Sequence, residues 1–179
     1  MNPYGDEDRQ VDDEVDRIVD AWRTQRPDLD ARPMLVLSRV TRLARHLDRA
    51  RRAAFADHAL EAWEFDVLAA LRRAGPPYTL SPGALLTQTL VTSGTMTNRI
   101  DRLEARALVD RARDPADRRG VRVRLTAEGR ARVDAAMADL LDREARLLAG
   151  LNDDDRATLA VLLRRLTAPF ETAERPTEH

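Results

Sequence analysis

Apolar side chains recur every three to four positions along most of the chain, which is the period of an amphipathic α-helix. This pattern predicts a short helix from Val11 to Trp22 and a longer one that starts near Pro33. After these it predicts a short helix, a bend, and a helix of about ten residues that ends at Gly75. Most of residues 11–75 is therefore expected to be helical.

Two further helices are predicted around a tight turn. Ser81 followed by Pro82 indicates a helix start, because serine caps helix ends and proline fits the first turn. The next helix is expected from Thr92 or Ser93 to about Arg106. Its buried stripe would consist of Met96, Ile100 and Leu103.

Strict alternation replaces the helical period in residues 108–113 and 121–125, which predicts two short strands joined by the loop "DPADRRG". In the second strand, Arg122 and Arg124 share one face. The opposite face, which should point to the core, carries Val121, Val123 and Leu125. The result is a β-hairpin with a long basic tip.

Two helices complete the predicted fold. Thr126 caps a helix that runs to about Leu148, and Asn152 caps the last one. Three aspartates at 153–155 complement the dipole of that last helix. The fold class is mainly α with a small β-wing.

The composition changes this picture only locally. The 179 residues carry a net charge of −1, and all 30 basic residues are Arg. Nine of them fall between residues 99 and 124, against five acids, whereas residues 6–16 hold seven acids and one Arg. Charge is therefore segregated along the chain, with the basic part around the hairpin.

Several classes of function are disfavoured. The chain has no cysteine, so thiol catalysis, thiolate metal sites and disulfides are excluded. It has neither a Gly-rich phosphate loop nor a GxSxG motif, and its three His lack metal-ligand spacing. We therefore expect no enzyme, no cofactor and no metal. An acidic start and the lack of a long apolar run predict a cytoplasmic protein without membrane contact.

The stretch "SGTMTNRIDRLEARALVDRARDPADRRGVRVRLTAEGR" resembles the winged helix–turn–helix of MarR-family transcriptional regulators. The resemblance covers about forty contiguous residues, and the flanking helices fit the family order across residues 34–169. One departure is Ala107, where the family usually has Gly at the end of the recognition helix. Since Ala in a left-handed cap costs up to about 1 kcal/mol, this helix end is expected to be shaped differently.

The family fold implies a winged helix–turn–helix plus a helical dimerisation domain. The chain then divides into a tail at 1–9, N-terminal helices at 10–62 and the DNA-binding domain at 63–126. C-terminal dimerisation helices follow at 127–170, with a second tail at 171–179. A homodimer is expected because the apolar stripes of the flanking helices are too extensive for one subunit to cover. These stripes include Leu37, Val40, Leu140, Leu141, Leu159, Leu162, Leu163 and Leu166.

Candidate DNA-binding residues lie on the recognition helix and the wing. Short polar side chains at a helix start suit contacts to phosphates and base edges. They are Ser93, Thr95, Thr97 and Asn98. By resemblance to the family, Arg119 would enter the minor groove and Arg118 would contact phosphate. The implied partner is a pseudo-palindromic operator in double-stranded DNA, bound by a repressor.

The sequences "AWRTQRPDLD" and "WEFDVLAALRRAG" resemble the urate-responsive, PecS-like branch of the family, which has an additional N-terminal helix. The ligand-binding set of that branch falls on Trp22, Asp66, Arg99 and Arg111. Two guanidinium groups, one carboxylate and one indole suit a planar anion with N–H groups, such as urate. Related purines or phenolic acids fit less fully.

Other interpretations stay open for these residues. Trp22 can simply pack its helix on the core, Asp66 can pair within its helix, and the two arginines can bind phosphate or acids. The repressor can also respond to a phenolic or antibiotic-like ligand. A further alternative is a ligand-independent winged-helix module with an architectural or protein-binding role.

Overall fold

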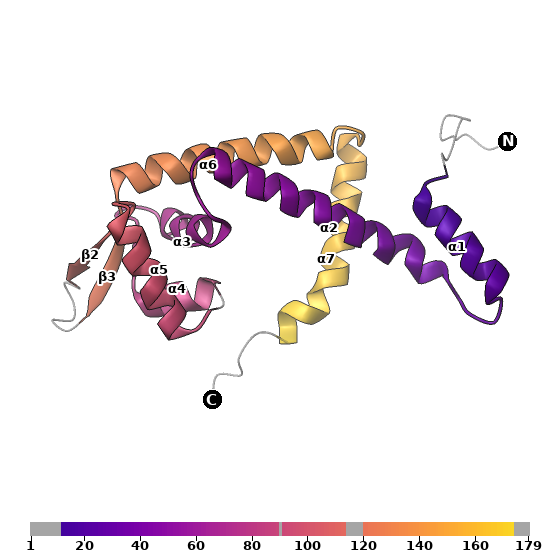
Figure 1. Ribbon diagram of the computed structural model, residues 1–179, viewed down its shortest axis with the longest axis horizontal. Coiled ribbons are helices and arrows are strands. Elements are labelled where there is room, and N and C mark those ends of the chain that lie inside the picture. The colour runs from indigo at the N-terminus through magenta and orange to yellow at the C-terminus, as the bar shows by residue number, and fades with distance from the viewer. Residues whose placement is uncertain (1–11, 90, 114–119, 174–179) are drawn as a thin grey trace. The chain divides into compact units, whose positions relative to one another are not determined.

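The structure is a computed structural model that describes residues 12–89, 91–113 and 120–173 (Figure 1). Contacts divide the chain into two compact units, residues 1–49 and 50–179, and each is described by itself. The helices are α1 (Glu14–Gln25), α2 (Arg32–Asp57), α3 (Ala62–Arg73), α4 (Pro82–Thr89), α5 (Ser93–Ala105), α6 (Ala127–Leu147) and α7 (Asp153–Ala173). The strands are β1 (Thr79–Leu80), β2 (Val109–Arg113) and β3 (Val121–Leu125). The predicted mainly α fold with a β-wing is confirmed.

The first unit is a helical pair formed by α1 and the first part of α2. The Asp13 carboxylate caps α1 by accepting from the backbone N–H groups of Val15 (2.7 Å) and Asp16 (3.1 Å). Because of this cap, α1 begins three residues later than predicted and runs on to Gln25. Its small buried core consists of Val15, Val19 and Ala31.

Ion pairs supplement that small core. The Arg39 guanidinium on α2 donates to Asp13 (2.9 Å) and to Asp16 (2.7 Å) on α1. The hydrogen bond from Arg39 lowers the pKa of Asp13. Arg42 pairs in the same way with Glu14. Exposed ion pairs therefore add to the apolar contact between the two helices of the first unit.

The second unit has one continuous apolar core between α3, α4, α5, α6 and the sheet. The last turn of α2 contributes Phe55, whose ring stacks on that of Phe65 with centroids 4.1 Å apart. Burying a large apolar side chain contributes about 1.5–3 kcal/mol, so this core holds the unit together. Its largest fully buried apolar side chains are Phe55, Leu68, Leu71, Leu85, Met96, Leu103 and Leu108.

The connection into α3 differs from the prediction in one detail. The chain forms no separate short helix before the bend, because α2 continues without a break to Asp57. The bend itself is the turn that follows, where Ala59 adopts a left-handed conformation (φ 53°). The N–H of Leu60 donates back to the carbonyl of Phe55 (2.8 Å), which ends the helix.

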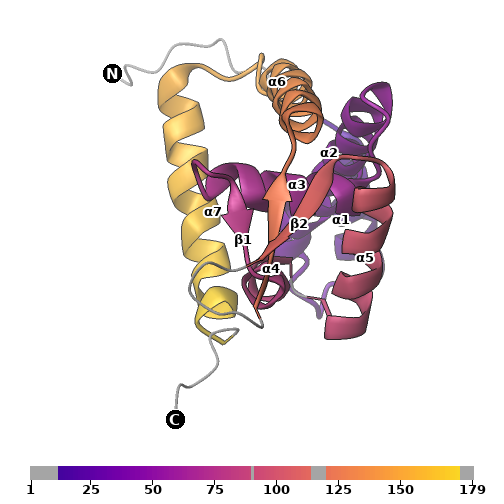
Figure 2. The ribbon, with the colours of Figure 1, turned by 90° about the vertical axis from the view of Figure 1, so that its left-hand side faces the viewer.

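The wing is part of a three-stranded antiparallel sheet in the order β1-β3-β2, and α5 lies beside it (Figure 2). The register pairs Val109 with Leu125 and Arg113 with Val121. Val123 and Leu125 face the core as predicted, but Val121 does not, since 45% of it is exposed. It lies at the end of the hairpin away from the core, so that part of the prediction is wrong.

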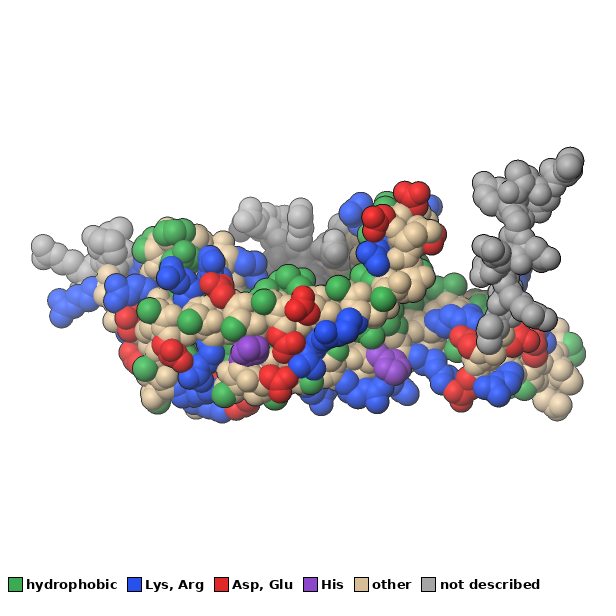
Figure 3. All heavy atoms as spheres, turned by 90° about the horizontal axis from the view of Figure 1, so that it is seen from above, with side chains coloured by type: hydrophobic (Ala, Val, Ile, Leu, Met, Phe, Trp, Pro, Cys, Tyr) green, Lys and Arg blue, Asp and Glu red, His purple; other side chains and the backbone are tan. Residues whose placement is uncertain are grey.

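Many apolar side chains of the flanking helices remain at the surface, and Figure 3 shows such side chains between charged ones on one face of the molecule. No residue of α7 from 153 to 170 is buried. Leu140 of α6 differs from the prediction, because it is buried within its own chain. The exposed apolar residues include Val36, Leu37, Val40, Leu43, Leu141, Val161, Leu162, Leu163, Leu166 and Phe170.

Candidate nucleic-acid interface and effector residues

The start of α5 carries an exposed row of small polar side chains. Thr92 caps the helix by accepting from the N–H of Thr95 (3.4 Å). The buried stripe is the predicted one, Met96, Ile100 and Leu103, so the opposite face is turned to solvent. That face carries the candidate DNA-binding residues Ser93, Thr95, Thr97 and Asn98. Such donors and acceptors at the positive end of a helix suit phosphate and base contacts.

A tryptophan on α3 holds the next turn of α5. The guanidinium groups of Arg99 and Arg102 lie over the Trp63 ring, 5.4 Å and 4.6 Å from its centroid. The Glu61 carboxylate accepts from the Trp63 indole (2.7 Å) and from Arg102 (2.7 Å). The indole hydrogen bond, more than the ion pair, lowers the pKa of Glu61. The sequence analysis did not single out Trp63, although it is the first residue of the stretch "WEFDVLAALRRAG".

The C-terminal end of α5 is fixed by a buried carboxylate. Glu64 is the one charged side chain among the described residues that is fully buried, and it pairs with Arg106 at 2.5 Å. The same guanidinium donates to the carbonyl of Ala59 (2.6 Å), in the turn after α2. Arg106 therefore connects the end of α5 to the turn after α2. The sequence does hint at this buried pair, because Glu64 falls on the apolar stripe of α3 with Val67, Leu68 and Leu71, and a buried acid needs a partner.

At the junction between α5 and the wing, the helix ends in a left-handed residue. Ala107 adopts the left-handed conformation (φ 56°) and the N–H of Leu108 donates to the carbonyl of Leu103 (3.0 Å). The expectation of a differently shaped helix end is therefore wrong, because Ala107 adopts the left-handed conformation despite its steric cost. The Thr126 hydroxyl closes the junction by donating to the carbonyl of Ala107 (2.8 Å).

Gly129 explains the last part of the "RLTAEG" motif. A Cβ atom at this position would lie 2.0 Å from the carbonyl oxygen of Leu108, so only glycine fits. Its N–H donates to the Thr126 hydroxyl (2.9 Å), which caps α6 as predicted. The motif therefore joins α6 closely to the start of the wing.

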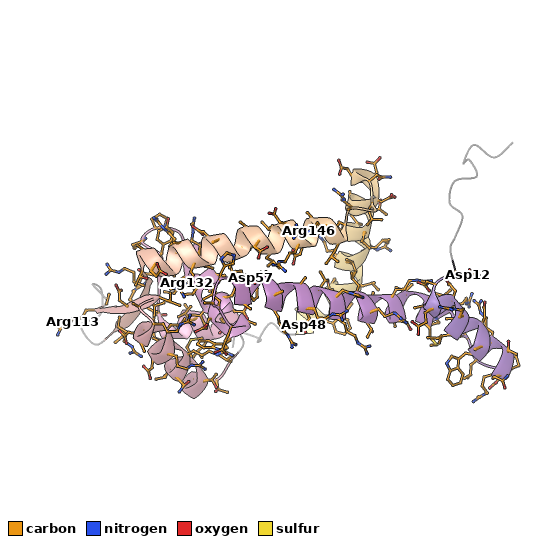
Figure 4. The ribbon with its side chains drawn as sticks, turned by 45° about the horizontal axis from the view of Figure 1, so that its top comes forward. Asp12, Asp48, Asp57, Arg113, Arg132 and Arg146 are labelled. Carbon is orange, nitrogen blue, oxygen red and sulfur yellow. The ribbon has the colours of Figure 1, made fainter. Side chains whose placement is uncertain are left out.

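The arginines of the wing differ in what they contact. Arg124 donates twice to Asp110 on the neighbouring strand (3.0 and 2.8 Å), so its charge is already paired. Arg113, the last residue of β2, projects outward at the end of the described hairpin (Figure 4). The two predicted groove contacts, Arg118 and Arg119, lie outside the described residues.

The four candidate effector residues have separate surroundings. Trp22 belongs to the first unit, where it is 48% exposed and lines a small pocket with Leu29 and Met34. In the second unit Arg99 lies over Trp63, whereas Arg111 pairs with Asp101 and Glu104. The pKa of Arg111 is raised, mostly by its hydrogen bond to Asp101.

Asp66 lines a cleft of about 280 Å³ whose basic residues are Arg51 and Arg73. Neither Arg99 nor Arg111 is among the described residues that line it. In this structure the second unit therefore holds the three candidate residues in three different places.

Within the described ranges, no three His, Asp or Glu side chains are grouped in a way that would hold a metal ion. Nor does any helix in the described part have the length and apolarity needed to cross a membrane. The arrangement instead consists of an exposed polar helix start beside a basic hairpin. Together these define a winged-helix DNA-binding protein.

Comparison with known proteins specifies the family. A model of the MarR family matches residues 60–120. The HTH-type transcriptional regulator PecS of Dickeya dadantii is 38% identical over 86% of this chain and 92% of its own length. The chain therefore belongs to the MarR family; it is a DNA-binding transcriptional regulator and not an enzyme.

Two solved structures support the same assignment. A mutant of E. coli MarR in complex with operator DNA is 27% identical, with a TM-score of 0.61 over 81% of this chain and 96% of that one. BpsR of Bordetella bronchiseptica, described with regulation of its DNA binding by 6-hydroxynicotinic acid, is 33% identical. Its TM-score is 0.55, over 72% of this chain and 92% of that one.

Proposed function

We propose that this protein is a transcriptional repressor that binds a pseudo-palindromic operator as a homodimer and is released by a small planar anion. The observation that carries the DNA-binding part is the start of α5. Ser93, Thr95, Thr97 and Asn98 are all exposed there, while Met96 anchors the same turn in the core. A rigid helix that presents several polar side chains is suited to a major groove.

Dimerisation is proposed because the flanking helices leave apolar side chains uncovered. Half of Leu162 and Leu166 on α7 is exposed, and Leu37 on α2 is 57% exposed. A second copy of the chain is the occupant that a palindromic operator requires. The two recognition helices would then lie about 34–36 Å apart, one helical turn of DNA.

The effector is proposed to be urate or a related planar anion that carries ring N–H or O–H groups. Two observations support this class: the likeness to PecS over 86% of the chain, and the likeness to BpsR, whose DNA binding responds to 6-hydroxynicotinic acid. Trp22, Asp66, Arg99 and Arg111 are the residues that the family resemblance offers for it. In the structure Arg99 lies over the face of Trp63, and both line an open hollow.

The test begins with selection of the operator from random duplex DNA, followed by fluorescence anisotropy with the selected site. Affinity should fall steeply between about 50 and 200 mM salt, because bound arginines release counterions. Arg119→Ala should weaken binding, while Arg45→Ala, a matched change on α2, should not. A complex that is insensitive to salt would contradict the proposed interface.

Release is measured on the same complex by adding urate or 6-hydroxynicotinate. A coupling of about 1–3 kcal/mol corresponds to roughly a five- to 150-fold weaker operator affinity. Arg99→Ala and Arg111→Ala should still fold and bind operator but lose this response. If both variants release operator at the wild-type ligand concentration, these two arginines do not bind the ligand. If the wild type responds to neither compound, the proposed effector class is wrong.

A further inference from the structure

The open hollow beside Trp63 runs along the flank of α5. It has a volume of about 540 Å³ and is lined by Glu61, Trp63, Gly94, Thr95, Asn98, Arg99 and Arg102. Two of these, Thr95 and Asn98, are candidate DNA-binding residues, so the hollow adjoins the surface that would enter the major groove. We propose that it receives the sugar-phosphate backbone of the operator, with Arg102 as a phosphate contact, Gly94 as the point of closest approach and Trp63 as a positioning residue. This rests on the proposed function and adds three residues to the interface.

The hollow lies where a DNA strand would pass. Gly94, Asn98 and Arg102 are four residues apart and therefore form one row along α5, with a rise of about 12 Å. A bound α-helix fills a major groove about 12 Å wide, so the flanks of that helix face the two backbones. A hollow along one flank of α5 would therefore lie beside phosphates rather than bases.

The hollow is basic although it contains an acid. The guanidinium groups of Arg99 and Arg102 stand against the carboxylate of Glu61, the one acid among the described residues that line it. Arg102 donates one hydrogen bond to Glu61 (2.7 Å), and a guanidinium group has five N–H donors. Arg102 can therefore keep this partner and still donate to a phosphate oxygen, an anion that the net charge of the hollow favours.

Trp63 holds both guanidinium groups in place in the protein without DNA. Its side chain packs against the core of the second unit, and its ring carries Arg102 at 4.6 Å and Arg99 at 5.4 Å. The indole N–H donates to Glu61 (2.7 Å), which keeps that carboxylate beside Arg102. An Arg side chain that is already ordered loses less entropy when it binds. Trp63 should therefore raise operator affinity by holding Arg102 ready for the phosphate.

Gly94 is a glycine that the fold of the described residues does not require. A Cβ atom there would meet no atom within 4 Å, and its φ lies outside the left-handed region. Gly129 differs, because a Cβ there would lie 2.0 Å from a carbonyl oxygen. Since Ala stabilises a helix relative to Gly, the fold alone would favour a side chain at position 94. The missing side chain instead leaves room for close approach of a DNA backbone.

Gly94→Ala tests the close approach, because its effects on folding and on binding should have opposite signs. The thermal midpoint of the full-length protein should rise by about 1–3 °C, since the helix gains propensity. Operator affinity, measured by fluorescence anisotropy with the selected site, should fall about fivefold or more, because the methyl group overlaps the DNA backbone. Gly150→Ala is the control: an added Cβ is equally free there and should leave operator affinity unchanged.

Arg102→Gln tests the phosphate contact; Arg99 is left unchanged, since it is also a candidate effector residue. The slope of log affinity against log salt concentration should decrease by about one, because one fewer counterion is released. Arg156→Gln is the matched control, since Arg156 also pairs with an exposed acid, Asp153 (3.3 Å), and it should keep the wild-type slope. Single methylphosphonates in the operator then locate the phosphate. At one position the neutral group should weaken binding of the wild type but not of Arg102→Gln.

Substitutions of Trp63 distinguish positioning from packing. Trp63→Leu removes the ring face and should weaken operator binding about three- to tenfold, whereas Trp63→Phe keeps a ring for the cations and should retain most of the affinity. Combined with Arg102→Gln, Trp63→Leu should have a smaller effect than it has alone, because the side chain that it positions is gone. A purely structural role of Trp63 would give the same effect in both backgrounds.

The outcomes separate this inference from the proposed function. If Arg102→Gln keeps the wild-type salt dependence, Arg102 contacts no phosphate and the hollow does not receive the backbone. A Gly94→Ala protein with wild-type affinity, or a Trp63→Leu effect that does not depend on Arg102, would contradict the roles given to those residues. In each of these cases the wild type still binds its operator, so the proposed function stands. If the wild type selects no site from random duplex DNA, both fail.

Discussion

Among the residues that the structure describes, twenty buried ones form one apolar cluster in the second unit, whereas three, Val15, Val19 and Ala31, form that of the first unit. The recognition helix and wing are therefore supported within a single chain. The first unit relies on Arg39 and Arg42, whose ion pairs with α1 are exposed and therefore only weakly stabilising. The difference shows that α5 and the wing are packed within one chain, and it supports the proposal that a second copy covers the apolar side chains left exposed on α2 and α7.

The largest effect is expected from a substitution inside the second unit. Gly129→Ala places a methyl group 2.0 Å from the Leu108 carbonyl oxygen, so α6 must move away from the start of the wing. We expect a loss of about 3 kcal/mol in the free energy of unfolding, as for severe overpacking. Urea denaturation followed by circular dichroism measures it.

Gly150→Ala serves as the control, because an added Cβ there meets no atom within 4 Å. It should change the free energy of unfolding by about 0.5 kcal/mol or less. Equal losses in the two variants would mean that Gly129 is not constrained by the Leu108 carbonyl.

A smaller effect is expected from the ion pair at the end of the recognition helix. Arg106→Met leaves the Glu64 carboxylate buried without its cation, and we expect a loss of about 2–3 kcal/mol, less than for a fully buried pair. Arg102→Met removes an exposed pair with Glu61 and should cost much less, because solvent screens that pair. Urea denaturation of the two variants measures the difference.

The same variants distinguish positioning from DNA contact. Arg106→Met should lower operator affinity without changing its salt dependence, because Arg106 is occupied by Glu64 and Ala59 and reaches no phosphate. A reduced salt dependence in Arg106→Met would show that this residue contacts DNA instead.

The smallest effect concerns the first unit at low pH. Asp13 has a lowered pKa because Arg39 donates to it, so its ion pair stabilises the folded state above the unfolded pKa of about 4. That contribution is lost as the pH falls through the lower folded pKa. Asp13→Asn keeps a capping side chain but has no carboxylate to protonate.

Emission from Trp22 in a Trp63→Phe background reports on the first unit. Between about pH 5 and pH 2, where carboxylates titrate, the Asp13→Asn protein should show a smaller decrease in its thermal midpoint than the protein with Asp13. Identical decreases would show that this ion pair does not stabilise the first unit.

Sequence reasoning located the elements better than their contacts. Periodicity and caps predicted α4, α5, the strands and α6. The hydroxyl groups of Ser81, Thr92 and Thr126 do accept backbone N–H groups at the starts of the three helices, as their positions in the sequence indicate. The contacts of Trp63 and Glu64 were missed, since they depend on which helix packs against α3. The conformation of Ala107 was predicted wrongly because the surrounding junction outweighs the local preference.

The candidate effector set shows the same limit. Residue types matched the family at Trp22, Asp66, Arg99 and Arg111, but a residue type does not reveal its neighbours. Arg111 lies beside two acids and Arg73 beside none that pairs with it in the described part of the chain. Such differences arise from packing between elements, which a single sequence does not contain.

The mass of the protein in solution tests most directly whether the flanking helices require a second copy. Light scattering at micromolar concentration should give twice the chain mass of 20.2 kDa. Leu162→Glu with Leu166→Glu, on the exposed face of α7, should lower that mass, whereas Arg164→Glu between them should not. A wild-type protein that is folded and has the mass of one chain would contradict the account.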